Sequence, residues 1–196
     1  PGWCGYEALD SKPQRPSRND SESSLGMIDF IAPLFVPGHR PDRFAKAVAS
    51  GADAIIIDLE DAVPSSEKAT ARNAIDISFT SLPVIIRVNG LKSAWFAEDV
   101  RAVRRAGAAA LMLPKADASM LELAETLSGL DVIALLESAQ GIADARAVAT
   151  LPWVSRLAFG SVDYSADLGC EETQESLLLA RSEIVLAVSY THLTLP

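Results

Sequence analysis

Short apolar runs that each end in a charged residue recur along this chain, and they restrict the folds open to it. Segments with the periodicity of helices separate these runs. Fully apolar short strands that alternate with helices are typical of a parallel sheet buried on both faces. The charges that close the runs are Asp58, Arg87, Glu137 and Asp163. We therefore expect an α/β fold whose charged side chains gather at the carboxyl ends of the strands, where barrel enzymes carry out their chemistry.

The pattern predicts a succession of strand–helix units between Phe30 and Ala187. Predicted strands are 30–36, 54–58, 84–88, 108–113, 132–136 and 156–159, and predicted helices are 41–50, 65–77, 94–106, 119–127, 142–149 and 172–187. A doubly wound open sheet is the alternative, but it would gather its charged strand ends at one switch point. Because the charged ends recur along the whole chain, we expect a (β/α)8 barrel, present here as about six of its eight units.

Both ends of the chain differ from this pattern. Residues 1–26 are rich in Ser, Pro, Arg, Asn and Asp and have no apolar period, so we expect a disordered or non-native leader. Residues 188–196, VSYTHLTLP, do not continue the helical pattern, and the string matches the translation of a transposon-end sequencing adapter. We expect this tail to be non-native. Residues 27–187 are then a partial barrel that forms the catalytic domain.

Composition excludes several classes of function. The net charge is −9, and no basic stripe is available to neutralise nucleic-acid phosphates. No apolar run reaches the ~18 residues that a membrane-spanning helix needs, and no secretory signal is recognisable. The two cysteines, Cys4 and Cys170, form neither a disulfide framework nor a zinc-binding pattern. We therefore expect a cytoplasmic protein that binds neither nucleic acid nor membrane.

Ordered motifs along the chain carry a resemblance to a known family. They are LFVPGHRP, KAVASGADAIIIDLEDAVPSSEKATAR, IIRVNG, LMLPKAD, LLESAQGI and LAFGSVDYSADLG. Together they resemble the HpcH/HpaI aldolase and citrate lyase family, in its citrate lyase β-subunit-like branch, from about Phe30 to Ala187. The resemblance implies a TIM barrel of the phosphoenolpyruvate/pyruvate type, a magnesium ion, and C–C bond cleavage or formation on 2-keto-acid units. The partner unit in this branch is usually an acyl thioester.

Two carboxylates match the metal ligands of the family, Glu137 and Asp163. Mg²⁺ prefers oxygen ligands and often takes only one or two protein carboxylates, with substrate and water completing its shell. The alternative for Glu137 is a strand-end carboxylate in a salt bridge. Asp167 competes with Asp163 as a ligand, but it is better suited to capping or ordering the loop before Gly169.

Arg87 matches the family arginine that pairs with a substrate carboxylate. A planar guanidinium can bind a carboxylate through two parallel hydrogen bonds. The alternative is an arginine that neutralises Glu60 or Asp61 within the rim. By strand alternation, Asp58 and Glu60 share one face. We expect Asp58, Glu60 and Asp61 to support Arg87 or the waters of the metal rather than to react directly.

The first strand–helix connection supplies further substrate contacts. In the resemblance, the residue before Val-Pro-Gly touches substrate, which here is Phe35. Basic groups on the following helix help to bind coenzyme A phosphates, and Arg43 and Lys46 are the candidates, three residues apart on one helix face. A solvated basic face is the alternative. Lys115 is expected to remain a protonated amine, because a Schiff-base lysine needs strong desolvation.

These expectations lead to a function. We expect a Mg²⁺-dependent carbon–carbon lyase with Arg87 and Glu137 as catalytic residues. It would cleave a 3-hydroxy-3-carboxyacyl thioester (citryl, citramalyl or malyl, on coenzyme A or acyl carrier protein) to a 2-keto acid and an acyl thioester. One alternative is a class II 2-keto-acid aldolase of the same fold without a thioester. The other is an inactive fragment or a degenerate binding homologue.

The resemblance also carries implications about assembly. It implies a homotrimer or a larger homo-oligomer. It further implies that the carboxylate acting as acid and base on the thioester carbon comes from the C-terminal part of the barrel, often from a neighbouring subunit. No residue of this sequence is assigned to that role. We therefore expect the 196-residue chain to be inactive by itself.

Overall fold

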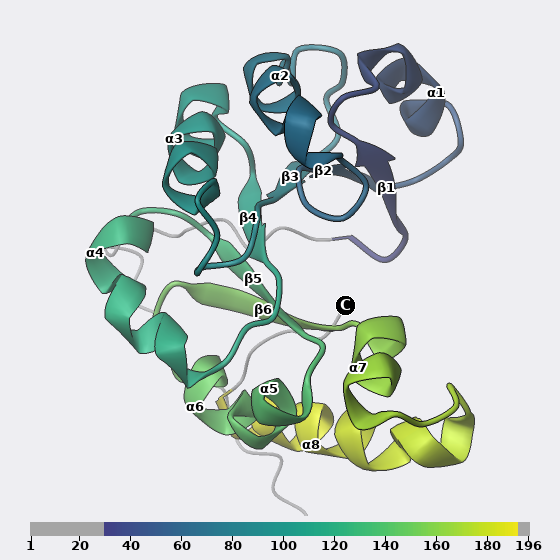
Figure 1. Cartoon of the computed structure of the whole chain (residues 1–196), viewed down its shortest axis with the longest axis vertical. Helices are drawn as coiled ribbons and strands as arrows, with labels where there is room; N and C mark the ends of the chain where they lie inside the picture. Colours follow the sequence, from purple (N-terminus) through teal and green to yellow (C-terminus); the bar gives the residue numbers. More distant parts are fainter. Residues whose placement is uncertain (1–29, 192–196) are drawn as a thin grey trace, which may run out of the picture.

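The computed structural model describes residues 30–191, which form a curved parallel sheet with helices on its outer side (Figure 1). Six strands follow one another in sequential order, each parallel to the next. They are β1 (Pro33–Pro37), β2 (Ala54–Asp58), β3 (Val84–Arg87), β4 (Ala110–Leu113), β5 (Val132–Leu136) and β6 (Val154–Phe159). A doubly wound sheet would reverse its strand order at a switch point. The sequential order is that of a (β/α) barrel, so the predicted fold class is confirmed.

Helices and short 3-10 turns connect the strands. The turns are η1 (Pro41–Arg43), η2 (Ser65–Glu67) and η3 (Ala118–Leu123). The α-helices are α1 (Phe44–Val48), α2 (Lys68–Asn73), α3 (Phe96–Ala106), α4 (Ala124–Leu127), α5 (Ala139–Ala143), α6 (Ala145–Ala149), α7 (Ser161–Leu168) and α8 (Gln174–Thr191). Every predicted strand and helix has a counterpart, but most of the helices are shorter than predicted or begin as a 3-10 turn. Short connections of this kind bring each chain segment quickly back to the next parallel strand.

The structure corrects two predictions near the C-terminal end of the described residues. Residues 161–168 form a helix, α7, which the sequence analysis assigned to the end of a strand run and a loop. Gly169 ends this helix with a φ of 66°, in the left-handed conformation that glycine accepts most easily. The helix predicted to end at Ala187 continues to Thr191, and Val188 is buried in the core. The helical pattern therefore extends into the segment 188–196, whose proposed non-native origin stays a prediction.

Two apolar layers follow from the alternation of side chains along the strands. The inner face of the sheet carries Ala54, Ile56, Ile85, Ala110, Met112, Ile133 and Leu135, and Phe30, which precedes β1, packs with them. The residues next to them in the strands, such as Ile55 and Ile57, point outwards and share one apolar cluster with helix residues such as Phe44, Val103 and Ile184. Because successive side chains of a strand face opposite ways, a run such as Ala54–Ile57 must be apolar throughout to be buried on both sides.

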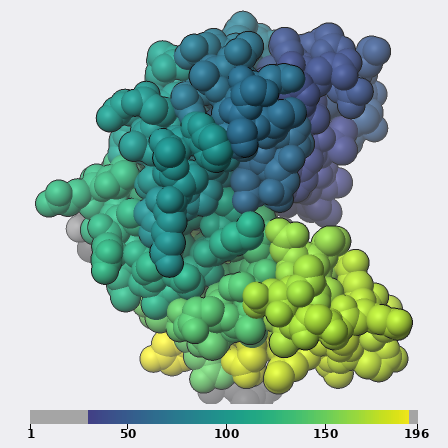
Figure 2. All heavy atoms as spheres, viewed as in Figure 1, coloured from purple at the N-terminus to yellow at the C-terminus, as the bar shows by residue number. Residues whose placement is uncertain are grey.

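The strand register brings the charged ends to one rim. Asp58 at the end of β2 lies opposite Arg87 at the end of β3, and Leu136 of β5 lies opposite Phe159 of β6. Glu137 directly follows β5, so it lies at the same edge of the sheet. Figure 2 shows the molecule hollowed between the N-terminal elements, in purple and blue, and the segment of α7 and α8, in yellow-green.

The end segments 1–29 and 192–196 lie outside the described residues, and so do the predicted leader and most of the predicted tail. Cys4 belongs to the first of these segments, whereas Cys170 is a free, exposed cysteine. Within residues 30–191, no helix combines the length and the apolar character needed to cross a bilayer.

Candidate functional site

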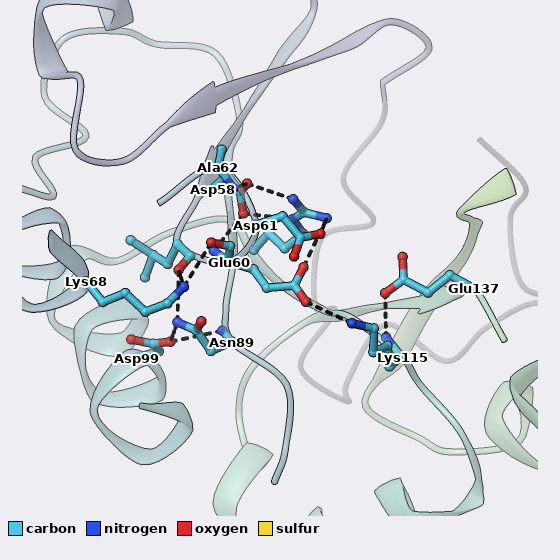
Figure 3. A network of polar contacts seen from close by, with 11 residues as sticks. Asp58, Glu60, Asp61, Ala62, Lys68, Asn89, Asp99, Lys115 and Glu137 are labelled. Atoms are coloured by element: carbon cyan, nitrogen blue, oxygen red, sulfur yellow. Dashed lines mark hydrogen bonds and ion pairs between the residues drawn. The ribbon is translucent and has the colours of Figure 1, made fainter. Parts of the chain in front are cut away.

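Arg87 pairs with three carboxylates from the segment that ends β2. Figure 3 shows these carboxylates, Asp58, Glu60 and Asp61, gathered in one cluster. Its Nε and Nη2 donate to the two oxygens of Asp58 at 2.8 and 2.7 Å, which is a bidentate pair. Its Nη1 lies 3.1 Å from Glu60 Oε2 and 3.7 Å from Asp61 Oδ2. Asp58 and Glu60 thus face the same way, as alternation predicted. Asp58 occupies the edge of the guanidinium formed by Nε and Nη2, and Glu60 and Asp61 face Nη1 on the other edge.

Burial and charge act in opposite directions on this cluster. Burial alone would raise the pKa of Asp58, but hydrogen bonds from Arg87 and from two backbone amides outweigh it, so the pKa lies below its usual value. Burial would lower the pKa of Arg87, and the same pairing raises it instead. For Glu60 burial prevails over the charge of Arg87, and the pKa rises to about 7. The cluster therefore holds a permanently charged arginine beside one carboxyl group that titrates near neutral pH.

Glu137 stands apart from this cluster at the end of β5, and it is almost fully buried. Its Oε1 accepts a hydrogen bond of 2.8 Å from the backbone N–H of Lys115. Burial raises the pKa of Glu137 to about 7, against the effect of that hydrogen bond, and the charges of Glu60 and Asp163 add to the rise. The rim thus brings Glu137 into electrostatic contact with Asp163 and with the Arg87 cluster.

Asp163 lies in the first turn of α7 and is half-buried, rather than following a strand directly. Asp167, its predicted competitor, lies one turn later on the same helix. Its Oδ2 accepts a hydrogen bond of 2.8 Å from Ala139 N, so it ties α7 to the beginning of α5. The prediction that Asp167 caps or orders the loop before Gly169 stays a prediction, and the structure adds this contact with α5. Helical spacing, which the sequence analysis did not assign here, places the two aspartates one turn apart.

The donor set of Glu137 and Asp163 suits a hard divalent cation. Among residues 30–191, no group of three or more His, Cys, Asp or Glu side chains is arranged to hold a metal ion. Mg²⁺ does not need one, because it commonly keeps several waters and binds one or two protein carboxylates. Gly160 leaves the space beside Glu137 open, since a Cβ at that position would lie 2.7 Å from Glu137 Oε2. The residues present therefore fit a magnesium ion held by two protein ligands.

The first strand–helix connection forms the wall beside Arg87. The ring of Phe35 lies 5.1 Å from Arg87 Cζ, within the range of a cation–π contact. One pocket is lined by Phe35, Pro37, Asp58, Asp61, Ala62 and Arg87. A neighbouring groove shares Phe35 and adds the basic residues Arg40, Arg43 and Lys46. The pocket and the groove therefore meet at Phe35, Val36 and Pro37, and Arg43 and Lys46 line the same groove.

A buried polar network beneath the 58–61 segment escaped the sequence analysis. Lys68 Nζ donates to the carbonyls of Leu59 and Glu60, both at 2.9 Å, and lies 5.0 Å from the ring of Trp95. Asn89 Nδ2 also donates to Leu59 O, at 2.9 Å, and to Asp99 Oδ2, at 2.6 Å. Burial lowers the pKa of Lys68, and nearby carboxylates oppose this. The network fixes the backbone from which Glu60 and Asp61 reach Arg87.

A signal for part of this network was present in the sequence. Asp99 is fully buried on the face of α3 that also carries Phe96, Val100 and Val103. A single acidic residue within an apolar helical stripe indicates a buried partner, because an unpaired carboxylate is too costly to bury. The partner is Arg72, whose Nε lies 2.7 Å from Asp99 Oδ1.

Comparison with known proteins identifies similar sequences. Residues 32–195 match the family model described as HpcH/HpaI aldolase/citrate lyase. A citrate lyase subunit beta-like protein of Deinococcus radiodurans is 36% identical over 176 residues, which cover 81% of this chain and 61% of that protein. A (3S)-malyl-CoA thioesterase of Cereibacter sphaeroides is 32% identical over 157 residues, covering 76% of this chain and 55% of that protein. The chain thus spans about three fifths or less of the length of these curated relatives.

A solved structure with the same architecture was determined with bound ligands. It is the citrate lyase beta subunit of Mycobacterium tuberculosis complexed with oxaloacetate and magnesium. The two share 34% sequence identity and superpose with a TM-score of 0.73, over 83% of this chain and 75% of that one. Oxaloacetate is a 2-keto acid with two carboxylates.

Proposed function

Because the chain belongs to the HpcH/HpaI aldolase/citrate lyase family, we propose that its rim is the site of a Mg²⁺-dependent carbon–carbon lyase. One observation carries the proposal: Arg87 and Glu137 stand at the ends of β3 and β5 on a single edge of the sheet, and Gly160, which lies against Glu137 Oε2, directly precedes the helical turn that carries Asp163. Two carboxylates for a cation and an arginine for a carboxylate are what a 2-keto acid and its hydroxy precursor require. The oxaloacetate and magnesium bound by the Mycobacterium tuberculosis neighbour agree with that chemistry.

The substrate we propose is a 3-hydroxy-3-carboxyacyl thioester. In the cleavage, the hydroxyl group loses its proton and its C–O bond becomes the C=O bond of a 2-keto acid. The C–C bond to the carbon beside the thioester breaks, and its electron pair forms the thioester enolate. Protonation of that enolate completes the acyl thioester. A Mg²⁺ ion held by Glu137 and Asp163 would supply Lewis-acid stabilisation of the oxygen that bears the developing negative charge.

The protein residues bind and orient the substrate. Arg87 would bind the carboxylate next to the hydroxyl group through its Nη1 and Nη2 edge, because Asp58 occupies the other edge. The substrate carboxylate would there take the place of Glu60, whose Oε2 lies 3.1 Å from Nη1. The ring of Phe35 lies over the guanidinium. Glu60 and Asp61 lie close to Nη1. The pKa of Glu60 is about 7, so below neutral pH its carboxyl group is largely uncharged. It then competes only weakly with the substrate carboxylate for Arg87.

The thioester end would extend along the groove lined by Arg43 and Lys46. Two basic side chains next to the charged pocket suit the phosphates of coenzyme A or of a carrier-protein prosthetic group. The name of the Cereibacter sphaeroides relative, a malyl-CoA thioesterase, supports a coenzyme A thioester. A homotrimer or larger assembly stays a prediction.

The binding half of the proposal is tested first. Titration calorimetry with Mg²⁺, and then with oxaloacetate in the presence of Mg²⁺, should show metal-dependent binding of the keto acid. Gly160→Ala places a methyl group against Glu137 Oε2 and should weaken Mg²⁺ binding at least tenfold. Gly90→Ala is the matched control, because a Cβ there meets no atom within 4 Å. Equal Mg²⁺ affinity in the two variants would contradict the assignment of Glu137 to the metal.

The reaction is tested with citryl-, citramalyl- and malyl-CoA. A lyase releases a 2-keto acid and leaves the coenzyme A thiol esterified, so keto acid should form without free thiol. Free thiol without keto acid would identify a thioesterase, the activity in the name of one relative. Cleavage of a free hydroxy-keto acid alone would identify a class II aldolase. Because the 196-residue chain is expected to be inactive by itself, the assay uses the protein extended to the length of its curated relatives. An extended protein that binds Mg²⁺ but turns over none of these substrates would contradict the lyase and favour a binding homologue.

A further inference from the structure

Lys115 has a backbone conformation that its side chain does not favour. Its φ is 51°, in the left-handed region. Among residues 30–191, the other residues with positive φ are all glycines, namely Gly51, Gly107, Gly129 and Gly169. A residue with a Cβ pays a steric cost in this region, and such residues persist where the surrounding structure imposes the conformation, often at functional sites.

The left-handed conformation displaces Lys115 from the pairing between β4 and β5, whereas Ala116 takes part in it. The β4–β5 ladder ends with Leu113 opposite Ala134. Ala116 N then donates to Leu135 O at 3.0 Å, so the contact between the two segments resumes after Lys115. Lys115 N itself donates across to Glu137 Oε1 at 2.8 Å. The displaced residue thereby directs its N–H at a side chain of the next strand, as bulged residues at the ends of strands do.

This hydrogen bond divides the roles of the two oxygens of Glu137. Oε1 is held by Lys115, and the other oxygen points away from that bond in Figure 3. The second oxygen, Oε2, lies against Gly160, the residue that precedes α7 and therefore Asp163. The backbone of Lys115 thus determines which oxygen of Glu137 is available on the side of Asp163.

The side chain of Lys115 makes a weaker contact. Its Nζ lies 3.7 Å from Glu60 Oε1, and the side chain is 59% exposed. An ion pair that is open to solvent contributes little, because water and salt screen it. Geometry therefore favours the backbone over the ammonium group as the functional part of this residue.

We propose that Lys115 is a positioning residue whose left-handed backbone, rather than its ammonium group, orients Glu137 for cation binding. The inference rests on the proposed function, because it takes Glu137 as a ligand of Mg²⁺. It distinguishes this lysine from one that reacts with substrate, and it makes a prediction about which substitutions the position tolerates.

A substitution series separates backbone from charge. Gly and Asn adopt the left-handed region most readily, Ala does so less readily, and the β-branched Val least. Mg²⁺ affinity, measured by calorimetry with MgCl₂ alone, should remain within about threefold of wild type for Lys115→Gly and Lys115→Asn. It should fall through Lys115→Ala to a loss of about 10- to 100-fold for Lys115→Val, the usual effect of losing an outer partner of a metal ligand. Lys92→Val, at an exposed lysine of ordinary backbone conformation, is the control and should leave the affinity unchanged.

Two patterns would overturn the inference. Equal losses in all four Lys115 variants would assign the role to the ammonium group, and four unchanged affinities would show that the conformation is not needed. Circular dichroism must show that Lys115→Val is folded before its affinity is interpreted.

A measurement without metal keeps this inference separate from the proposed function. Hydrogen exchange of the Lys115 amide should become at least tenfold faster in Glu137→Ala, because its acceptor is lost. An unchanged exchange rate would overturn the inference regardless of the Mg²⁺ affinities. Failure of the wild-type chain to bind Mg²⁺, with this acceleration present, would overturn the metal site and leave the hydrogen bond standing.

Discussion

Arg87 is held by a contact that a guanidinium can make and an ammonium group cannot. Two parallel hydrogen bonds to Asp58 fix the plane of its side chain, and Phe35 lies over it. Arg87→Lys keeps the positive charge but loses the planar group that makes two parallel hydrogen bonds. We expect oxaloacetate affinity in the presence of Mg²⁺ to fall about 10- to 100-fold, the equivalent of one charge-assisted hydrogen bond. Calorimetry measures this loss.

The control for this substitution is Arg101→Lys on α3, an exposed arginine paired with Glu98. Surface pairs of this kind contribute little, so the control should bind oxaloacetate like wild type. If Arg87→Lys bound the keto acid as tightly as the control does, the carboxylate-binding role of Arg87 would be wrong.

Glu60 makes the stability of the protein depend on pH. Burial raises its pKa from 4.5 to about 7, so the folded state holds this proton more tightly than the unfolded state does. The protonated Glu60 therefore contributes to the free energy of unfolding. This contribution is present in full below the pKa of the unfolded state, near 4.5, and is lost as pH rises through about 7. A shift of this size corresponds to at most about 3 kcal/mol of unfolding free energy.

Glu60→Gln removes this titration. Relative to wild type, the variant should therefore gain unfolding free energy between pH 4 and pH 8, by up to about 3 kcal/mol. Urea unfolding at a series of pH values measures the difference. Glu122→Gln, at an exposed glutamate, should follow the wild-type curve. A constant difference between Glu60→Gln and wild type across this range would show that Glu60 titrates normally.

At the scale of elements, α3 is joined to the rim through one buried carboxylate. Asp99 accepts hydrogen bonds from Arg72, from Asn89 N at 2.9 Å and from Asn89 Nδ2. Asp99→Ala would leave the guanidinium of Arg72 buried without its partner, which typically costs about 3–5 kcal/mol. Urea unfolding should show this loss. Glu98→Ala, one residue away on the exposed face of the same helix, should cost no more than about 1 kcal/mol.

The contrast between Asp99 and Glu98 tests the network as a unit. The network also holds the carbonyl of Leu59 through Asn89. Asp99→Ala should therefore weaken oxaloacetate binding as well as stability, because Glu60 and Asp61 follow Leu59. A variant that is destabilised but binds the keto acid normally would restrict the network to a structural role.

Elements were predictable from the sequence where period and composition agree. The strands 54–58 and 132–136 have the predicted bounds, because consecutive Ile, Val, Leu and Ala residues can be buried on both faces of a sheet. Helix α7 was missed because the apolar run Leu157–Val162 continues past the end of β6, and periodicity in so short a segment does not distinguish strand from helix. Ser161 near its beginning and Gly169 after its end were usable signals of a helix.

Within the site, residue types and the faces of strand residues were predictable, and the local backbone conformation after a strand was not. Strand alternation placed Asp58 and Glu60 on one face, and the structure shows both beside Arg87. The contact between Lys115 N and Glu137 depends on a backbone dihedral angle that no composition rule assigns to a lysine. The roles of the candidate site residues stay predictions until the variants are measured.

For the whole molecule, strand order separated the two candidate architectures. The sheet runs in sequential order from β1 to β6, and among the described strands β1 pairs with β2 alone and β6 with β5 alone. Unpaired sheet edges offer backbone hydrogen-bonding groups to other chains. Helix α8 adds exposed apolar side chains on the outer surface, Leu178, Leu179, Val185 and Leu186. Both features favour association between copies of the chain.

We therefore expect self-association that rises with protein concentration, measured by sedimentation velocity. Leu179 and Leu186 are 69% and 53% exposed and lie seven residues apart, on one face of α8. Burial of each leucine contributes at least about 1.5 kcal/mol, so Leu179→Lys with Leu186→Lys should weaken association about 100-fold or more. Leu121→Lys, at a leucine 56% exposed in η3, is the control and should associate like wild type. Equal weakening in the control would indicate a general effect of added charge, and association unchanged in the double variant would place the contact at the sheet edges instead.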